Sequence, residues 1–467
     1  MRLRTLLSLA LPLAAPPVGA QDALDARLDS LRQHLRIPGM AWALVEGDAV
    51  VHARAVGATR AGERFETGTP LRFASVTKLL TGLLLAEAVA EGRLDPHAPI
   101  VTFLPGFGGD PEVSVAQLAA HVSEGVPGAA YVYGTSRFAL LRPVLERIYG
   151  QPLDALIRER LLAPAGARWH ESPQLGTHAG LVSTVDDMAR VVAAHLAGRL
   201  VSPRAAGLLR RAFRGPGPAR YPAGLGAFVQ EVSGEPLVWS FGQDDPDHSG
   251  ALVVIAPERR RALVLLANDN VVSDPFRLLM GDLTTSPFAL AWLEHLGLDV
   301  AALRPRSELL TALGRRDRPA ALARLAELLP AVVASGESDH ALHYAAAVLG
   351  AEGVEDIART LADRMAARFP NDRWVQLFNA GLYADLGLPE QAAAAWWRML
   401  GLRNQEPDFL QRLFQAWAWR GLASLYRESA PERARACVER GLATGVTGET
   451  RDDLLALQQQ LAPPDGR

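Results

Sequence analysis

The spacing of hydrophobic residues divides roughly the first 300 residues into strands at both ends and helices between them. Short apolar runs bounded by turn residues predict five strands: 40–45, 49–56, 236–241, 251–256 and 262–268. Apolar residues that recur every three or four positions predict two helices: 22–35 and 75–91. The middle of the segment is typical of helices and loops. Strands that join the two ends of a segment around inserted helices predict an α+β layer arrangement with a helical insertion.

Beyond about residue 300 the pattern changes to almost pure helix, rich in Ala, Leu and Arg. A faint repeat runs through it, because Gly350 and Pro370 are echoed 37 residues later by Gly387 and Pro407. This offset is close to the ~34-residue period of tetratricopeptide helix pairs. We therefore favour a tetratricopeptide-like helical-repeat domain over an unrelated helical bundle. The expected boundaries are 21–298 for the α+β domain and 299–467 for the helical domain.

Composition excludes several classes of protein. The chain has 467 residues, is 49% hydrophobic and carries a formal net charge of −3, so no basic surface indicates a nucleic-acid partner. Cys437 is the only cysteine, which excludes an intrachain disulfide and Cys-based zinc or iron–sulfur sites. No His-Glu-x-x-His motif, P-loop or G-x-S-x-G elbow is present. We expect neither a metal nor an organic cofactor.

The N-terminus has the pattern of an export signal. Arg2 and Arg4 precede an apolar run from Leu6 to Ala15, and Val18-Gly19-Ala20 supplies small residues suited to cleavage. This pattern predicts a signal peptide over residues 1–20 and a periplasmic or secreted protein. The apolar run is too short to span a bilayer and no later stretch is long enough, so no integral membrane segment is expected after cleavage.

Lys78 is the single lysine among 48 Lys and Arg residues. Arginine cannot deprotonate in a protein, so a retained lysine indicates chemistry that needs a proton acceptor. Lys78 belongs to Ser75-Val76-Thr77-Lys78, an S-x-x-K motif at the start of an apolar helix. Residues three apart share a helix face, so Lys78 can accept the proton of the Ser75 hydroxyl if burial and the helix dipole lower its pKa. The backbone N–H of Ser75 can serve as one oxyanion donor.

The segment Leu71–Lys78 resembles the nucleophile segment of serine hydrolases related to class C β-lactamases and D-Ala-D-Ala peptidases, the penicillin-binding-protein-like family. The resemblance covers roughly residues 25–290. It implies a β-lactamase-like antiparallel sheet flanked by helices, with a helical insertion. It also implies that Ser75 is the nucleophile and Lys78 its proton acceptor.

The family's second motif, Tyr-x-Asn, is matched by Tyr133-Gly134-Thr135, which follows Pro127-Gly128. By this resemblance Tyr133 is catalytic, because a phenol beside a lysine can act as a general base and later protonate the leaving group. The alternative is a half-buried packing aromatic. Thr135 departs from the family's asparagine: it keeps a hydroxyl for substrate binding but loses the amide that would orient Lys78.

Two further stretches fit the family. Residues 113–123 resemble a stretch that ends in a His-Thr-Ser-Gly rim, but Glu124-Gly125 runs almost directly into Pro127-Gly128. The rim loop is therefore expected to be short and the cleft more open. Residues 179–187 resemble the family's capped-helix segment, for which we expect a structural role.

Two triplets compete for the third motif, Lys-Thr-Gly or His-x-Gly on the strand that lines the cleft. His248-Ser249-Gly250 matches the motif better, whereas Ser240-Phe241-Gly242 fits the architecture better because it ends the first of three successive strands. We favour the latter, with Ser240 and Gly242 in substrate binding and the Gln243 backbone N–H as second oxyanion donor. Either way, the lysine that helps many β-lactamases hold a substrate carboxylate is missing.

The resemblance implies an exported serine hydrolase that forms an acyl-enzyme on Ser75. We expect an ester or a small amide or peptide as substrate, ahead of β-lactams. The alternative is a catalytically weak or inert β-lactamase-like fold that binds a protein partner together with the helical domain. The departures at Thr135 and Ser240 favour this alternative, and the joint retention of Ser75, Lys78 and Tyr133 argues against it.

Overall fold

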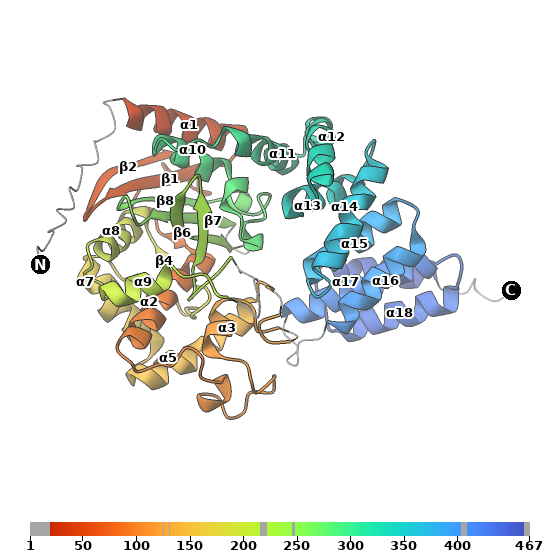
Figure 1. The fold of residues 1–467 in the computed structure, drawn as a ribbon, viewed down its shortest axis with the longest axis horizontal. Helices are drawn as coiled ribbons and strands as arrows, with labels where there is room; N and C mark the ends of the chain where they lie inside the picture. The colour runs from red at the N-terminus through yellow and green to blue at the C-terminus, as the bar shows by residue number, and fades with distance from the viewer. Residues whose placement is uncertain are drawn as a thin grey trace, which may run out of the picture.

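The computed structural model describes residues 19–124, 126–129, 131–214, 222–244, 248–402 and 409–461. They form a part centred on a sheet and, beside it, a part made of helices (Figure 1). This arrangement confirms the expected α+β fold followed by a helical region. All but the last two residues of the predicted signal peptide lie outside the described residues, as does Pro407 of the proposed repeat.

The central sheet has six strands in the order β2-β1-β8-β7-β6-β5, and every neighbouring pair is antiparallel. The strands are β1 (Gly39–Glu46), β2 (Ala49–Gly57), β5 (Phe228–Val232), β6 (Glu235–Asp244), β7 (Ser249–Ala256) and β8 (Arg261–Ala267). Pairing of β1 with β8 joins the two ends of the segment, as the pattern predicted. Strand β5 was not predicted from the sequence, because it is an edge strand in which Gln230 and Glu231 interrupt the apolar run.

Both faces of the sheet are covered by helices, because alternate residues of a strand point to opposite sides. On one side Ala41 and Ala43 pack into a core with α2 (Thr77–Ala90) and α8 (Val185–Leu196). On the other side Met40 and Trp42 pack into a core with α1 (Ala20–His34) and α10 (Pro287–His295). Figure 1 shows these two layers. The remaining helices of this part are α3 (Val115–Ala119), α4 (Thr135–Ala139), α5 (Leu141–Tyr149), α6 (Leu153–Ile157), α7 (Ala163–Ala165) and α9 (Pro203–Leu209).

A two-stranded sheet and a helix cap stabilise the sheet-centred part. Strands β3 (Leu71–Arg72) and β4 (Val182–Ser183) pair next to the S-x-x-K motif. Helix α8 begins after Thr184, whose hydroxyl accepts a hydrogen bond from the Asp187 backbone N–H at 3.0 Å. The capped helix predicted within residues 179–187 is therefore present, and the structural role of this segment stays a prediction.

The helical part consists of successive antiparallel helices around a third hydrophobic core. Its helices are α11 (Arg304–Gly314), α12 (Arg318–Ser335), α13 (His340–Leu349), α14 (Glu355–Arg368), α15 (Arg373–Asp385), α16 (Pro389–Gly401), α17 (Phe409–Tyr426), α18 (Pro431–Ala443) and α19 (Glu449–Gln460). Gly350 and Gly387 take equivalent places, since each follows the first helix of a pair with φ 68°. The tetratricopeptide-like classification and the boundary at 298/299 stay predictions.

The helical part packs directly on the sheet-centred part. Leu310 of α11 and Ala341 of α13 belong to the same core as α1 and α10. Within the part of the chain that the structure describes, no helix is long and apolar enough to cross a membrane.

Candidate active site

Ser75 lies in a 3-10 turn, η1 (Ala74–Val76), that leads into α2. The α-helix therefore begins two residues later than the apolar pattern predicted. Ala74 has φ 45°, a left-handed conformation that is costly for a residue with a side chain. Thr77 stabilises this turn, because its hydroxyl donates to the Ala74 carbonyl at 2.7 Å and accepts from the Leu181 N–H at 3.2 Å. The sharp turn leaves Ser75 half-buried at the helix start.

Lys78 lies directly against Ser75. Its Nζ donates to Ser75 Oγ at 2.9 Å and to the His178 carbonyl oxygen at 2.8 Å. The side chain is 3% exposed, and this burial lowers the pKa of Lys78 to about 7. A lysine with this pKa is partly neutral at neutral pH and can accept a proton. The S-x-x-K spacing thus produces the contact that the sequence predicted.

Tyr133 approaches Ser75 from the other side of the site. Its phenol and the Ser75 hydroxyl are hydrogen-bonded, and Lys78 Nζ lies 5.0 Å from the centre of its ring. Burial raises the pKa of Tyr133 above its ordinary value, and the hydrogen bond to Ser75 offsets only part of this effect. The phenol therefore keeps its proton at neutral pH. The structure brings Ser75, Lys78 and Tyr133 together.

His121 is a site residue to which the sequence analysis assigned no role. Its ring packs between Tyr133 and Phe138, with ring centres 4.4 and 5.4 Å away. Its Nδ1 accepts a hydrogen bond from the Gly134 N–H at 3.2 Å, and its carbonyl oxygen accepts one from the Val132 N–H at 2.8 Å. Burial lowers the pKa of His121 well below its usual value, so the ring is neutral and supports the Tyr133 segment. Its place in the rim-like stretch was the only signal in the sequence.

The end of β6 forms the opposite wall of the site. Within the described residues, the pairing of β6 with β5 ends at Phe228 and Trp239, so the β5 ladder does not continue along the part of β6 that begins at Ser240. The Phe241 ring lies 5.6 Å from the Tyr133 ring. A Cβ built on Gly242 would lie 2.2 Å from the Phe73 carbonyl oxygen, so this glycine allows β6 to approach the turn that carries Ser75.

The competing triplet lies on the next strand. Gln243 pairs with Gly250 and Asp244 with Ser249, so both triplets reach the same edge of the sheet. The Ser249 hydroxyl is buried and donates to the Arg72 carbonyl oxygen at 2.8 Å, which is a structural contact. The close approach of Gly242 to Phe73 supports Ser240-Phe241-Gly242 as the third motif, and the roles of Ser240, Gly242 and Gln243 stay predictions.

Thr135, a predicted substrate-binding residue, does not contact Lys78 by a hydrogen bond among the described residues. It is the first residue of α4, two positions after Tyr133. Within the described part of the chain, the hydrogen bonds of Lys78 Nζ go to Ser75 and His178, and none joins it to Thr135. The His178 carbonyl oxygen therefore holds the Lys78 amine, and its position a hundred residues away left no signal in the sequence.

The glycine on β6 leads to a first prediction. We expect Gly242→Ala to lower the free energy of unfolding by about 1–3 kcal/mol, because its Cβ would overpack against the Phe73 carbonyl oxygen. Urea unfolding measures this effect. Gly207→Ala in α9 is the matched control, because a Cβ there meets nothing within 4 Å. Equal stability of both variants would contradict the close approach of β6 to the Ser75 turn.

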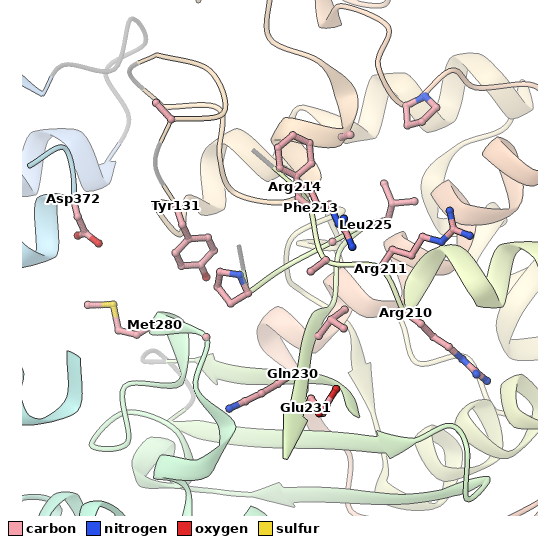
Figure 2. A pocket seen from close by; sticks show the side chains of 18 of the residues that line it. Tyr131, Arg210, Arg211, Phe213, Arg214, Leu225, Gln230, Glu231, Met280 and Asp372 are labelled. Carbon is pink, nitrogen blue, oxygen red and sulfur yellow. The ribbon is translucent and has the colours of Figure 1, made fainter. Parts of the chain in front are cut away.

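A crevice of about 1640 Å³ lies beside β5, between the sheet-centred part and the helical part (Figure 2). Tyr131, Met280 and Asp372 line one end of it, and Arg210 and Arg211 line the other. Neither Ser75 nor Lys78 lines it. The crevice is therefore separate from the serine–lysine pair, although Tyr131, which lines it, is two residues from Tyr133.

Comparisons with known proteins agree with this geometry. The sequence profile of the Beta-lactamase family matches residues 24–280. A D-aminopeptidase from Cereibacter sphaeroides is 31% identical over 188 residues, which cover 32% of this chain and 36% of the relative. Esterase EstB from Burkholderia gladioli is 26% identical over 195 residues, which cover 31% of this chain and 50% of the esterase. The chain thus spans a third to a half of the length of these curated relatives.

Solved structures show the same fold. The octameric penicillin-binding protein homologue from Pyrococcus abyssi matches with a TM-score of 0.52 and 18% identity over 62% of this chain and 81% of that one. A D-amino acid amidase from Ochrobactrum anthropi matches with a TM-score of 0.51 and 17% identity over 60% of this chain and 98% of that one. Because the family profile matches more than half of its residues, this chain belongs to the Beta-lactamase family.

Proposed function

We propose that this protein is an exported serine hydrolase that forms an acyl-enzyme on Ser75. The observation that carries the proposal is the buried Lys78 amine, which has a pKa of about 7 and lies 2.9 Å from Ser75 Oγ. A neutral amine at this distance is a general base for the serine. Tyr133, which is hydrogen-bonded to Ser75 and keeps its proton, is the matching general acid.

The steps follow from these three side chains. Lys78 accepts the Ser75 proton while Ser75 Oγ attacks the substrate carbonyl carbon. The negative charge on the carbonyl oxygen is stabilised by the backbone N–H groups of Ser75 and Gln243. Tyr133 protonates the leaving group as the tetrahedral intermediate collapses, and the proton on Lys78 restores the phenol. Water then hydrolyses the acyl-enzyme by the same groups in reverse.

The end of β6 favours a substrate without a free carboxylate beside the scissile bond. No lysine is present on this strand, and two carboxylates, Asp244 and Asp274, flank Gln243. The Gln243 amide donates to Asp274 at 3.5 Å, and Arg72 Nε lies 3.8 Å from Asp244. We therefore propose an ester or a small amide or peptide, ahead of β-lactams. Relatives named as an esterase and a D-aminopeptidase support these classes.

A second candidate is a β-lactamase-like fold that binds a partner without catalysis. The position of Thr135 favours it, because within the described residues no side-chain amide orients Lys78 in the place of the family's asparagine. The retained contacts among Ser75, Lys78 and Tyr133 favour the hydrolase.

A fluorophosphonate probe, which labels activated serines, separates the two candidates. We expect the mature chain to be labelled, Ser75→Ala to remain unlabelled, and Lys78→Arg to be labelled at least about 10²-fold more slowly, because arginine cannot accept the proton. Ser335→Ala, at an exposed serine that ends α12, is the control and should be labelled like the parent. A folded parent that is not labelled would exclude the hydrolase and favour the binding module.

A further inference from the structure

A buried ion pair links the helical part to the rim of the site. Arg373, the first residue of α15, places Nη1 3.1 Å from Oε2 of Glu124. The two side chains are only 4% and 7% exposed. The guanidinium also donates from Nη2 to the Leu402 carbonyl oxygen, which fixes its orientation. A pair this well buried has a defined geometry, unlike an exposed ion pair.

Glu124 lies against the backbone that follows Tyr133. A Cβ built on Gly134 would be 3.2 Å from Glu124 Oε1, so the carboxylate borders this glycine closely. The imidazole of His121 accepts the hydrogen bond of the Gly134 N–H. The peptide after Tyr133 therefore lies against two rim residues: His121 accepts its hydrogen bond, and Glu124, which is paired with Arg373 of α15, borders it.

A second contact holds the chain just before Tyr133. The Tyr131 hydroxyl donates to the Leu279 carbonyl oxygen at 2.8 Å. Arg277 precedes Leu279 by two residues, and its buried guanidinium packs on aromatic rings of α13 and α15. Its centre lies 4.7, 4.7 and 5.4 Å from three ring centres, which belong to Tyr344, Trp374 and Phe378. Stacking on aromatic rings stabilises a buried guanidinium. Tyr131, Met280 and the α15 N-cap residue Asp372 accordingly lie at the same end of the crevice (Figure 2).

We propose that Arg373 is a positioning residue of the active site: acting through Glu124, it sets the place of the Tyr133 phenol against Ser75. The helical part is then a component of the catalytic apparatus and does more than tether a partner. This inference rests on the proposed serine hydrolase function. Its physical basis is the steep dependence of proton transfer on geometry, since a displacement of about 1 Å costs about 10²-fold in rate.

The test uses the full-length mature chain with p-nitrophenyl acetate and the fluorophosphonate probe. We expect Arg373→Met and Glu124→Gln each to lower kcat about 10- to 100-fold with KM changed less than about twofold. The double variant should lose no more than the stronger single variant, because both changes break one contact. Arg373→Lys should restore part of the rate. Arg359→Met is the control, since Arg359 pairs with Asp363 on the exposed surface of α14 at 3.9 Å.

A Tyr133→Phe background distinguishes positioning from general support. If Arg373 acts through the phenol, Arg373→Met should slow labelling of Ser75 in the parent and have no further effect when Tyr133 is already phenylalanine. Thermal unfolding verifies that each variant is folded. If Arg373→Met does not fold, the nearly isosteric Glu124→Gln replaces it as the variant that breaks the ion pair.

The outcomes separate the two proposals. An unlabelled parent overturns the serine hydrolase function itself. A labelled parent whose Arg373→Met and Glu124→Gln variants keep full kcat overturns the positioning role alone. An equal loss of labelling rate in the parent and in the Tyr133→Phe background also overturns it, because the ion pair would then act on the fold and not on the phenol.

Discussion

Lys78→Met is expected to reduce kcat/KM at pH 7 by about 10²- to 10⁴-fold, the range typical of losing a general base. The reason is that Ser75 loses the amine, 2.9 Å away, which the proposed mechanism uses as proton acceptor. In the parent, kcat/KM should rise with pH up to about 7 and then level off, as Lys78 becomes neutral. An ester assay across pH 5–9 measures both effects. A parent whose rate does not change across this range would contradict a titrating Lys78.

The same variant is expected to be more stable than the parent at pH 7. The pKa of Lys78 is about 7 in the folded protein and about 10.4 in an unfolded chain, so the unfolded chain binds more protons between these values. The parent therefore gains stability as the pH rises through this window, and at pH 7 burial of the amine costs about 4 kcal/mol. Methionine removes this cost but leaves the His178 carbonyl oxygen without its donor, a loss of about 1–3 kcal/mol.

We therefore expect a net gain of about 1–3 kcal/mol at pH 7, which disappears or reverses near pH 10. Urea unfolding at both pH values measures this difference. Lys78→Arg is the matched control: it keeps a buried charge, so it should lose activity without gaining stability. A Lys78→Met protein that is less stable than the parent at pH 7 would show that the lysine is not destabilising in the folded state.

Tyr133→Phe should lower kcat by about 10²- to 10⁴-fold with little change in KM, because it removes the phenol proposed as the general acid but keeps the ring. The ring contacts with His121 and Phe241 remain, so the free energy of unfolding should fall by no more than about 1.5 kcal/mol. Tyr149→Phe is the control. This variant also removes a phenol, whose hydroxyl donates a 3.0 Å hydrogen bond to the Leu84 carbonyl oxygen. That contact lies outside the Ser75 site. Full activity of Tyr133→Phe would contradict the general-acid role and show that Tyr133 only packs in the site.

Most of the sheet and the contact between Ser75 and Lys78 could be predicted from local patterns. The continuous apolar run of β1 and the turn residues around β7 predict strands, because a short apolar run bounded by turn residues is typical of a strand buried on both faces. Ser75 and Lys78 meet because residues three apart lie one turn apart near a helix start. The edge strand β5 escaped prediction because its exposed face is polar and its apolar run is broken.

Other parts of the site depend on contacts between distant segments. The His178 carbonyl oxygen holds Lys78 from a hundred residues away, and Arg373 reaches Glu124 from another part of the chain. The packing around Lys78 removes its amine from water, and this burial brings its pKa near 7. Spacing along the chain specifies which groups can meet within one turn of helix or one strand. Burial, pKa and the support of Tyr133 arise only where separate elements pack together, because desolvation depends on every neighbour in space.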